Sequence, residues 1–118
     1  MSNQPKPELW IKLSLPGVGQ IGPGKMRLLQ LIDTHESIAA AARAMQMSYR
    51  RAWLLVEELN GLFGEPVVVK WQGGSRKGGA SLTEHGRALL DRYAVLVDNA
   101  NAANREVLDA IGRDLARR

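Results

Sequence analysis

The chain has 118 residues, 45% of them apolar and 24% charged, which is ordinary for one globular domain. Its net charge of +4 and pI of about 9.9 favour polyanionic partners. Cysteine is absent, which excludes disulfides, thiolate metal sites and cysteine nucleophiles. No apolar run approaches the roughly twenty residues of a membrane span, and MSNQPKPEL lacks the apolar core of a signal peptide, so we expect a cytoplasmic protein without a membrane partner.

The first third of the chain is predicted to form a tail, a strand and a helix. Residues 1–7 carry two prolines and polar groups, which is typical of a flexible tail. In residues 8–15 apolar and polar side chains alternate, which predicts a half-buried strand. Residues 16–22 are predicted to form a loop. Pro23 suits the first turn of a helix that continues to about His35.

The segment from Gly19 to Lys25 fits the pattern G-x-x-x-x-G-K of nucleotide-binding phosphate loops. Such a loop needs serine or threonine after the lysine to hold magnesium, and here Met26 follows. Pro23 also removes one of the backbone N–H groups that would surround the phosphates. Since the chain also lacks the alternating strands and helices of a parallel sheet, we interpret the glycines as a bend between strand and helix.

Two helices joined by a tight turn are predicted over residues 37–60. Ser37 is placed to cap a short alanine-rich helix that ends near Ala44, and Ser48 to cap the next helix. This second helix has apolar side chains at the spacing of one buried stripe, namely Ala52, Leu55, Val56 and Leu59.

A β-hairpin is predicted to follow these helices. PVVVKW, residues 66–71, is rich in β-branched side chains and predicts a strand. Residues 72–79 form a basic, glycine-rich loop, and residues 80–82 a short return strand. Two helices followed by such a hairpin are typical of a winged helix-turn-helix, whose second helix enters the major groove of DNA. We therefore predict a mainly α fold with a small β-hairpin (α+β), with the wing over residues 66–82.

The candidate DNA-contacting residues lie on the second helix and on the wing. Arginines at the exposed start of that helix can pair bidentately with guanine, and basic groups in the wing can contact phosphates. The predicted DNA-binding residues are Ser37, Ser48, Tyr49, Arg50, Arg51, Trp53, Leu54, Ser75, Arg76 and Lys77. Two alternatives stay open. In the first, the two helix arginines do not contact DNA but are solvated or paired with Glu57 and Glu58. In the second, Trp53 does not contact DNA but packs against a neighbouring element.

Several segments together resemble a known protein family. IAAAARAMQMSYRRAWLLVEELN, then FGEPVVV and GGSRKGGASLTEHGRALLDRY, are similar to the N-terminal DNA-binding domain of ModE, the molybdate-responsive transcriptional regulator. The resemblance covers roughly residues 9–100. AAARAM and LTEHG give a more distant likeness to LysR-type DNA-binding domains. The resemblance implies a winged helix-turn-helix over residues 8–83 that dimerises and binds a partly palindromic operator.

Two features depart from the family pattern. Gln46 stands in the turn where family members often have glycine, and a positive φ there would cost glutamine about 1 kcal/mol. The chain ends at Arg118, without the small β-barrel domains that bind molybdate in full-length ModE. We therefore expect no cofactor in this chain, and the resemblance assigns it no effector.

Residues 84–118 are predicted to form one long dimerisation helix capped by Thr83. Its apolar side chains repeat at alternating steps of three and four, which makes a heptad-like seam. Gly112 should weaken the last turns. The alternative is a monomer in which the helix folds back over residues 8–15. The residues expected to contact a second copy of the chain are Tyr93, Leu96, Val97, Ala100, Ala103, Val107 and Ile111.

These features predict a sequence-specific regulator of transcription that binds double-stranded DNA as a homodimer. One alternative is an architectural DNA-binding protein with weak sequence preference, and another is a protein-interaction adaptor built on a winged fold. His35 and His85 have no partner at metal-ligand spacing, and no serine stands in a hydrolase-type elbow. We therefore expect neither a metal site nor a catalytic residue.

Overall fold

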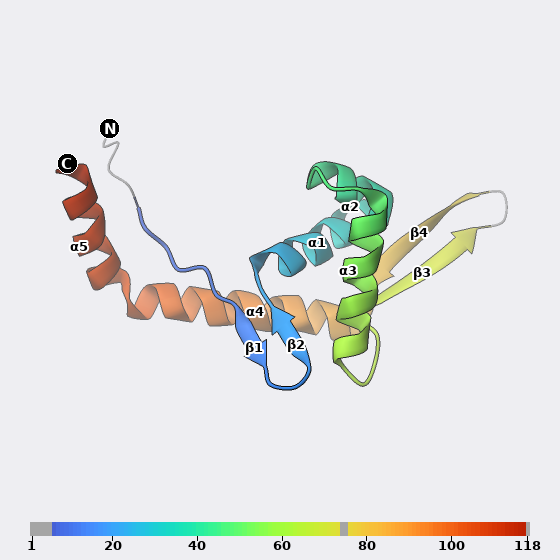
Figure 1. Ribbon diagram of the computed structural model, residues 1–118, viewed down its shortest axis with the longest axis horizontal. Coiled ribbons are helices and arrows are strands. Elements are labelled where there is room, and N and C mark those ends of the chain that lie inside the picture. The colour runs from blue at the N-terminus through green and yellow to red at the C-terminus, as the bar shows by residue number, and fades with distance from the viewer. Residues whose placement is uncertain (1–5, 74–75, 118) are drawn as a thin grey trace.

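The computed structural model describes residues 6–73 and 76–117, and it is mainly helical with two small antiparallel sheets. The molecule is elongated, measuring 59 × 33 × 21 Å (Figure 1). The α+β character agrees with the sequence-based prediction. In chain order the elements are β1 (Leu13–Leu15), β2 (Gly19–Ile21), α1 (Pro23–His35), α2 (Ile38–Ala44), α3 (Tyr49–Leu62), β3 (Val68–Gly73), β4 (Arg76–Leu82), α4 (Glu84–Ala103) and α5 (Arg105–Ala116).

The core lies where α1, α2 and α3 pack together beside the root of the hairpin β3–β4. Leu28, Leu29 and Ile32 of α1 have no exposed surface, and each such side chain contributes about 1.5–3 kcal/mol through its burial. The small side chains of α2 allow close approach to its neighbours. The predicted apolar stripe of α3 is confirmed: Ala52, Val56 and Leu59 are buried, and Leu55 is half-buried.

Three helices begin where the sequence placed their caps. In each case a hydroxyl oxygen accepts a hydrogen bond from the backbone N–H three residues later, which satisfies a donor that the helix leaves unpaired. The α3 helix continues two residues beyond the predicted end, so Gly61 lies inside it. The capping bonds are Ser37 Oγ with Ala40 N at 3.0 Å, Ser48 Oγ with Arg51 N at 3.1 Å, and Thr83 Oγ1 with Gly86 N at 3.0 Å.

The predicted strand over residues 8–15 is wrong for most of its length. Only Leu13–Leu15 pairs with another strand, and its partner β2 lies in the segment predicted to be a loop. The connection has Pro16 followed by Gly17 at a φ of 74°, and Val18 donates its N–H to the Leu15 carbonyl oxygen at 2.9 Å. This is the pattern of a type II turn, which the sequence-based prediction missed.

Residues 6–12, called the arm below, run along α4 and form no strand. The backbone of α4 cannot form β-ladder hydrogen bonds with the arm, because its N–H and C=O groups are already paired within the helix. Alternate residues of the arm are still half-buried, as the sequence pattern predicted. Side chains of α4 and α5 hold the arm instead, through Tyr93 Oη donating to Ile11 O at 2.6 Å, Leu9 N donating to Asn101 Oδ1 at 2.7 Å, and Arg105 Nη2 donating to Pro7 O at 2.9 Å.

The single helix predicted over residues 84–118 is also wrong, because the chain breaks at Asn104 between α4 and α5 (Figure 1). Asn104 donates its side-chain amide to the Ala100 carbonyl oxygen at 2.7 Å, and Asn101 does the same to Val97 at 2.9 Å. Asparagine side chains that bond the preceding turn compete with helical pairing, so Asn104 favours the end of α4 at this position, although Asn101 makes the same bond inside the helix. Gly112, expected to weaken the last turns, is buried inside α5.

The α4 helix joins the core only through its first half. Leu89, Leu90 and Tyr93 pack against the core cluster. Arg87 makes two hydrogen bonds to the Asp33 carboxylate, at 2.8 and 3.1 Å, and this contact raises the pKa of Arg87. Beyond Tyr93 the helix extends away from the core. No helix in the described residues is both long enough and apolar enough to span a membrane.

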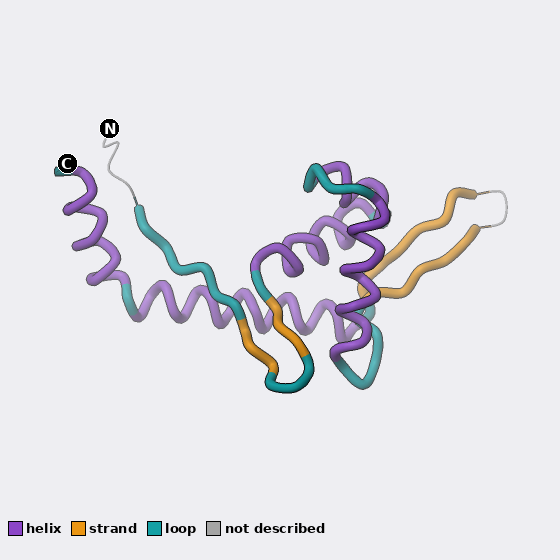
Figure 2. The backbone as a smooth tube through the Cα atoms, viewed as in Figure 1, coloured by secondary structure: helices purple, strands orange, loops and turns teal. Residues whose placement is uncertain are grey.

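The hairpin β3–β4 projects away from the helices at the end opposite α5 (Figure 2). Its strands pair antiparallel, with Val68 opposite Leu82 at the buried root and Trp71 opposite Gly79 farther out. Both strands extend beyond their predicted ends, because pairing continues to Gly73 and Arg76.

Candidate nucleic-acid interface

The turn between α2 and α3 is tight and contains one left-handed residue. Gln46 has a φ of 56°, which is the conformation considered for this position from the sequence. Met47 donates its N–H to the Ala42 carbonyl oxygen at 3.0 Å and so closes the end of α2. The turn places α3 across α2 and directs the first turn of α3 to solvent.

The first turn of α3 is a polar, solvent-facing surface. Tyr49 is 55% exposed, and Ser48, Arg50 and Arg51 are exposed beside it, whereas Ala52 is buried. Among residues 6–73 and 76–117, no carboxylate lies at ion-pair distance from either arginine. Both guanidinium groups are therefore available to an external anion.

The two glutamates of α3 pair with lysines rather than with these arginines. Glu57 forms an ion pair with Lys70 of β3, and Glu58 pairs with Lys25 of α1 at 3.1 Å. Lys25 also donates to the Gln20 carbonyl oxygen at 2.8 Å. The lysine of the G-x-x-x-x-G-K pattern thus joins β2 to α3, which agrees with a structural role for that segment.

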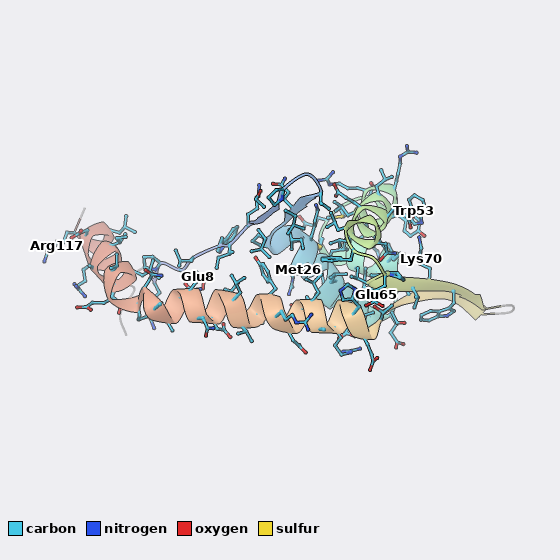
Figure 3. All side chains as sticks on the ribbon, turned by 90° about the horizontal axis from the view of Figure 1, so that it is seen from below. Glu8, Met26, Trp53, Glu65, Lys70 and Arg117 are labelled. Atoms are coloured by element: carbon cyan, nitrogen blue, oxygen red, sulfur yellow. The ribbon has the colours of Figure 1, made fainter. Side chains whose placement is uncertain are left out.

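Two further predicted DNA contacts, Trp53 and Leu54, lie on different sides of α3. Leu54 is 49% exposed and follows Arg50 by one helical turn, so the two share a face. Trp53 lies beneath the Lys70 ammonium, whose nitrogen is 4.6 Å from the ring centroid (Figure 3). Trp53 thus packs against β3, which agrees with the alternative that it contacts a neighbouring element.

The hairpin and the helices enclose an open groove of about 570 Å³. Lys70 and Trp71 line it; the sequence placed Lys70 only among the clustered basic residues that favour polyanion binding, and gave Trp71 no role. The alternation in PVVVKW could have identified Lys70, because it shares a strand face with buried Val68 and so points toward α3. The other lining residues include Ser37, Tyr49, Trp53 and Gly79.

The basic residues predicted to act in the wing are only partly described. Ser75 lies outside the described residues. Arg76 and Lys77 are placed by their backbone at the start of β4. Nearby, Gly79 lies against the Trp71 indole, which a side chain at this position would overlap. Within the described part of the chain, no group of three or more His, Asp or Glu residues is arranged to hold a metal ion.

The residues predicted for dimerisation do not form one straight seam. Tyr93, Val97 and Ala100 are half-buried on α4, and Tyr93 is bonded to the arm. The break at Asn104 directs α5 away from the line of α4 (Figure 1). The exposed members of the set are Leu96, Ala103, Val107 and Ile111.

The sequence is similar to those of molybdenum-related regulators and binding proteins. It is 40% identical over 86 residues to molybdenum-pterin-binding protein MopA of Rhodobacter capsulatus, covering 73% of this chain and 32% of MopA. It is 35% identical over 74 residues to the DNA-binding transcriptional dual regulator ModE of Escherichia coli K12, covering 63% of this chain and 28% of that protein. Over these residues the chain is similar in sequence to ModE and Mop proteins.

Other comparisons define the extent of this relationship. The transcriptional regulator ModE of Haemophilus influenzae is 33% identical over 89 residues, which are 75% of this chain and 35% of that protein. The chain thus spans about a third of the length of the curated relatives it matches. No protein-family model matches the chain. The relatives' names describe regulators and molybdenum-binding proteins, not enzymes, and they support a ModE-related family.

Proposed function

We propose that the chain is a sequence-specific transcriptional regulator of the ModE type that binds double-stranded DNA through a winged helix-turn-helix. In this proposal α3 is the recognition helix and the hairpin β3–β4 is the wing. The observation that carries it is the first turn of α3, where Arg50 and Arg51 are exposed with no carboxylate partner among the described residues. A bidentate arginine–guanine pair gives about 1–3 kcal/mol of discrimination between bases.

The neighbouring residues have complementary roles in this proposal. Leu54, on the same face as Arg50, can contact a thymine methyl group, and the Tyr49 hydroxyl can reach a phosphate. Arg76 and Lys77 of the wing contact the sugar–phosphate backbone. Because each phosphate contact releases counterions, binding should weaken steeply as salt rises.

We further propose that two copies associate through α4 and α5. Val107, Ile111 and Leu115 are 60%, 46% and 42% exposed and lie four residues apart, so they form one apolar stripe on α5. Exposed Val95 and Leu96 extend the apolar surface onto α4. A two-fold dimer would present two copies of α3 to half-sites about one DNA turn, or a multiple of it, apart.

Sedimentation at micromolar concentration tests the dimer. The unmodified chain should sediment as a dimer and Ile111→Asp as a monomer, because a carboxylate would be buried in the interface. Arg113→Asp is the matched control, since it introduces the same side chain on the opposite side of α5 and should leave the dimer intact. A monomeric unmodified chain would remove this part of the proposal.

Selection of bound sequences from random duplexes tests the regulator function. We expect enrichment of a partly palindromic sequence. We also propose that the described residues bind duplex without a cofactor, so molybdate or tungstate should change neither the selected sequence nor its affinity. Retardation of all duplexes without enrichment would favour an architectural protein instead. Absence of retardation even at low salt would favour a protein-interaction adaptor.

A further inference from the structure

One stripe of α3 faces the wing rather than the proposed DNA surface. It consists of Trp53, Glu57 and Asn60, which stand at i, i+4 and i+7 and therefore lie on one side of the helix. Each of the three contacts β3 or the residue that precedes it. From the sequence, Glu57 was a possible partner of the helix arginines and Trp53 was open to packing against a neighbouring element; in the structure both contact Lys70 of β3.

Asn60 holds the root of the wing. Its Oδ1 accepts hydrogen bonds from Val67 N at 2.8 Å and Val68 N at 3.0 Å, and its Nδ2 donates to Val68 O at 3.0 Å. Both valines are buried, so these backbone groups have little access to water as an alternative partner. The first residues of β3 are thus fixed to the last turns of α3.

Lys70 makes the next contact, farther out along β3. Its ammonium forms an ion pair with Glu57 and lies over the Trp53 ring (Figure 3). Two α3 side chains one turn apart therefore hold a single cation of the wing. Exposed ion pairs and cation–π contacts each contribute little to stability, so these contacts suit the setting of an angle better than the stabilisation of the fold.

The second strand has its own attachment, to the residue that follows α1. Ala80 of β4 donates its N–H to the Glu36 carbonyl oxygen at 3.2 Å. The hairpin is therefore attached on both strands near its root, and the described outer parts of β3 and β4 point away from the helices (Figure 1). Among the ion pairs and hydrogen bonds between α3 and β3 in the described residues, that of Lys70 lies farthest from the root.

We propose that Lys70, Glu57 and Trp53 form a junction that fixes the angle between the wing and α3, so that both meet a duplex as one preset unit. The inference rests on the proposed DNA-binding function. It assigns Lys70, Glu57 and Trp53 as positioning residues, although Lys70 and Trp53 lie where a direct DNA contact would be the ordinary expectation. Presetting the angle lowers the cost of ordering the wing during binding.

Removal of the Glu57 charge separates this role from simple electrostatics. Without a junction, Glu57→Gln takes a negative charge off a DNA-binding surface and should strengthen binding. With the junction, the same change frees the wing and should weaken binding by about twofold to fivefold, the range of an exposed ion pair. The two accounts differ in the direction of the effect.

Glu58→Gln is the matched control. It lies next to Glu57 on the same helix and is similarly exposed, and its own partner is Lys25 of α1, which bonds Glu58 and the Gln20 carbonyl oxygen. We expect Glu58→Gln to bind duplex as tightly as the unmodified chain or more tightly. The exchanged pair Glu57→Lys with Lys70→Glu restores the ion pair and should recover most of the affinity, which a direct contact of Glu57 with a base would not allow.

Hydrogen exchange of the β3 amides in the free protein provides a readout without DNA. It should be about twofold to fivefold faster in Glu57→Gln and unchanged in Glu58→Gln. If the unmodified chain binds no duplex, the proposed function fails, and exchange alone then decides the junction. If Glu57→Gln behaves as Glu58→Gln does in both measurements, the junction is overturned.

Discussion

The hydroxyl of Tyr93 donates a hydrogen bond to the carbonyl oxygen of Ile11 at 2.6 Å, which joins residues 82 positions apart in the chain. This bond holds the arm against α4 at the point where α4 leaves the core. The arm thus covers a part of α4 that the sequence pattern assigned to a partner chain. At Tyr93 the last part of the chain therefore packs on the N-terminal segment, as one alternative from the sequence had it. The apolar stripe of α5, formed by Val107, Ile111 and Leu115, stays exposed.

Tyr93→Phe should lower the free energy of unfolding by about 0.5–1.5 kcal/mol, because it removes this hydrogen bond and leaves the Ile11 carbonyl oxygen without its donor. Urea unfolding at neutral pH measures the change. Tyr49→Phe is the control, since Tyr49 is exposed and should change stability little. Equal effects of the two substitutions would contradict the role of the bond.

The stability contributed by Tyr93 should depend on pH. Burial raises the pKa of Tyr93 above its ordinary value of 10.0, so the unfolded chain loses this proton at lower pH than the folded chain. The contribution is complete below about pH 10 and is lost as the pH rises through the folded pKa. Urea unfolding at neutral and alkaline pH should show a smaller loss of stability for Tyr93→Phe than for the unmodified chain.

Gly86→Ala should destabilise the fold by about 1–3 kcal/mol. A Cβ at Gly86 would overlap the backbone carbonyl group of Val67, which cannot move because its oxygen accepts the Thr83 N–H at 3.0 Å. Gly61→Ala is the matched control, because Gly61 lies inside α3 with nothing within 4 Å of its added Cβ. That variant should gain about 0.5–1 kcal/mol, and thermal unfolding of both variants checks the contrast.

Gln46→Gly should stabilise the chain by up to about 1 kcal/mol, because glycine adopts the φ of 56° without the strain that a Cβ brings. Gln46→Ala keeps the Cβ and serves as the control. Denaturant midpoints would reveal the difference. A glycine variant no more stable than the alanine variant would mean that the turn is unstrained.

The helical half of the fold could be predicted because its signals are local. Ser37, Ser48 and Thr83 mark helix starts, and the spacing of buried residues in α3 follows from its periodicity. The exposure of Arg50 and Arg51 followed from the same periodicity. Such features depend on residues within one or two turns, so a single sequence contains them.

The errors arose where distant segments decide the structure. The alternation in residues 8–15 gave the correct faces, but only contact with α4 determines that the arm is not a strand. The break at Asn104 depends on an amide that the sequence pattern treated as an ordinary helical side chain. The meeting of Trp53 with Lys70 requires the angle of the hairpin, which no local pattern contains.

In the proposed function the first turn of α3 reads bases while the wing binds phosphates. Affinities of Arg50→Ala and Lys77→Ala for a selected duplex and for a random duplex, measured across a range of salt, separate these two roles. This division of roles predicts that Arg50→Ala weakens binding to the selected duplex by about 1–3 kcal/mol and binding to the random duplex little, whereas Lys77→Ala weakens both alike and lowers the salt slope by about one. Equal weakening of both duplexes by Arg50→Ala would contradict it.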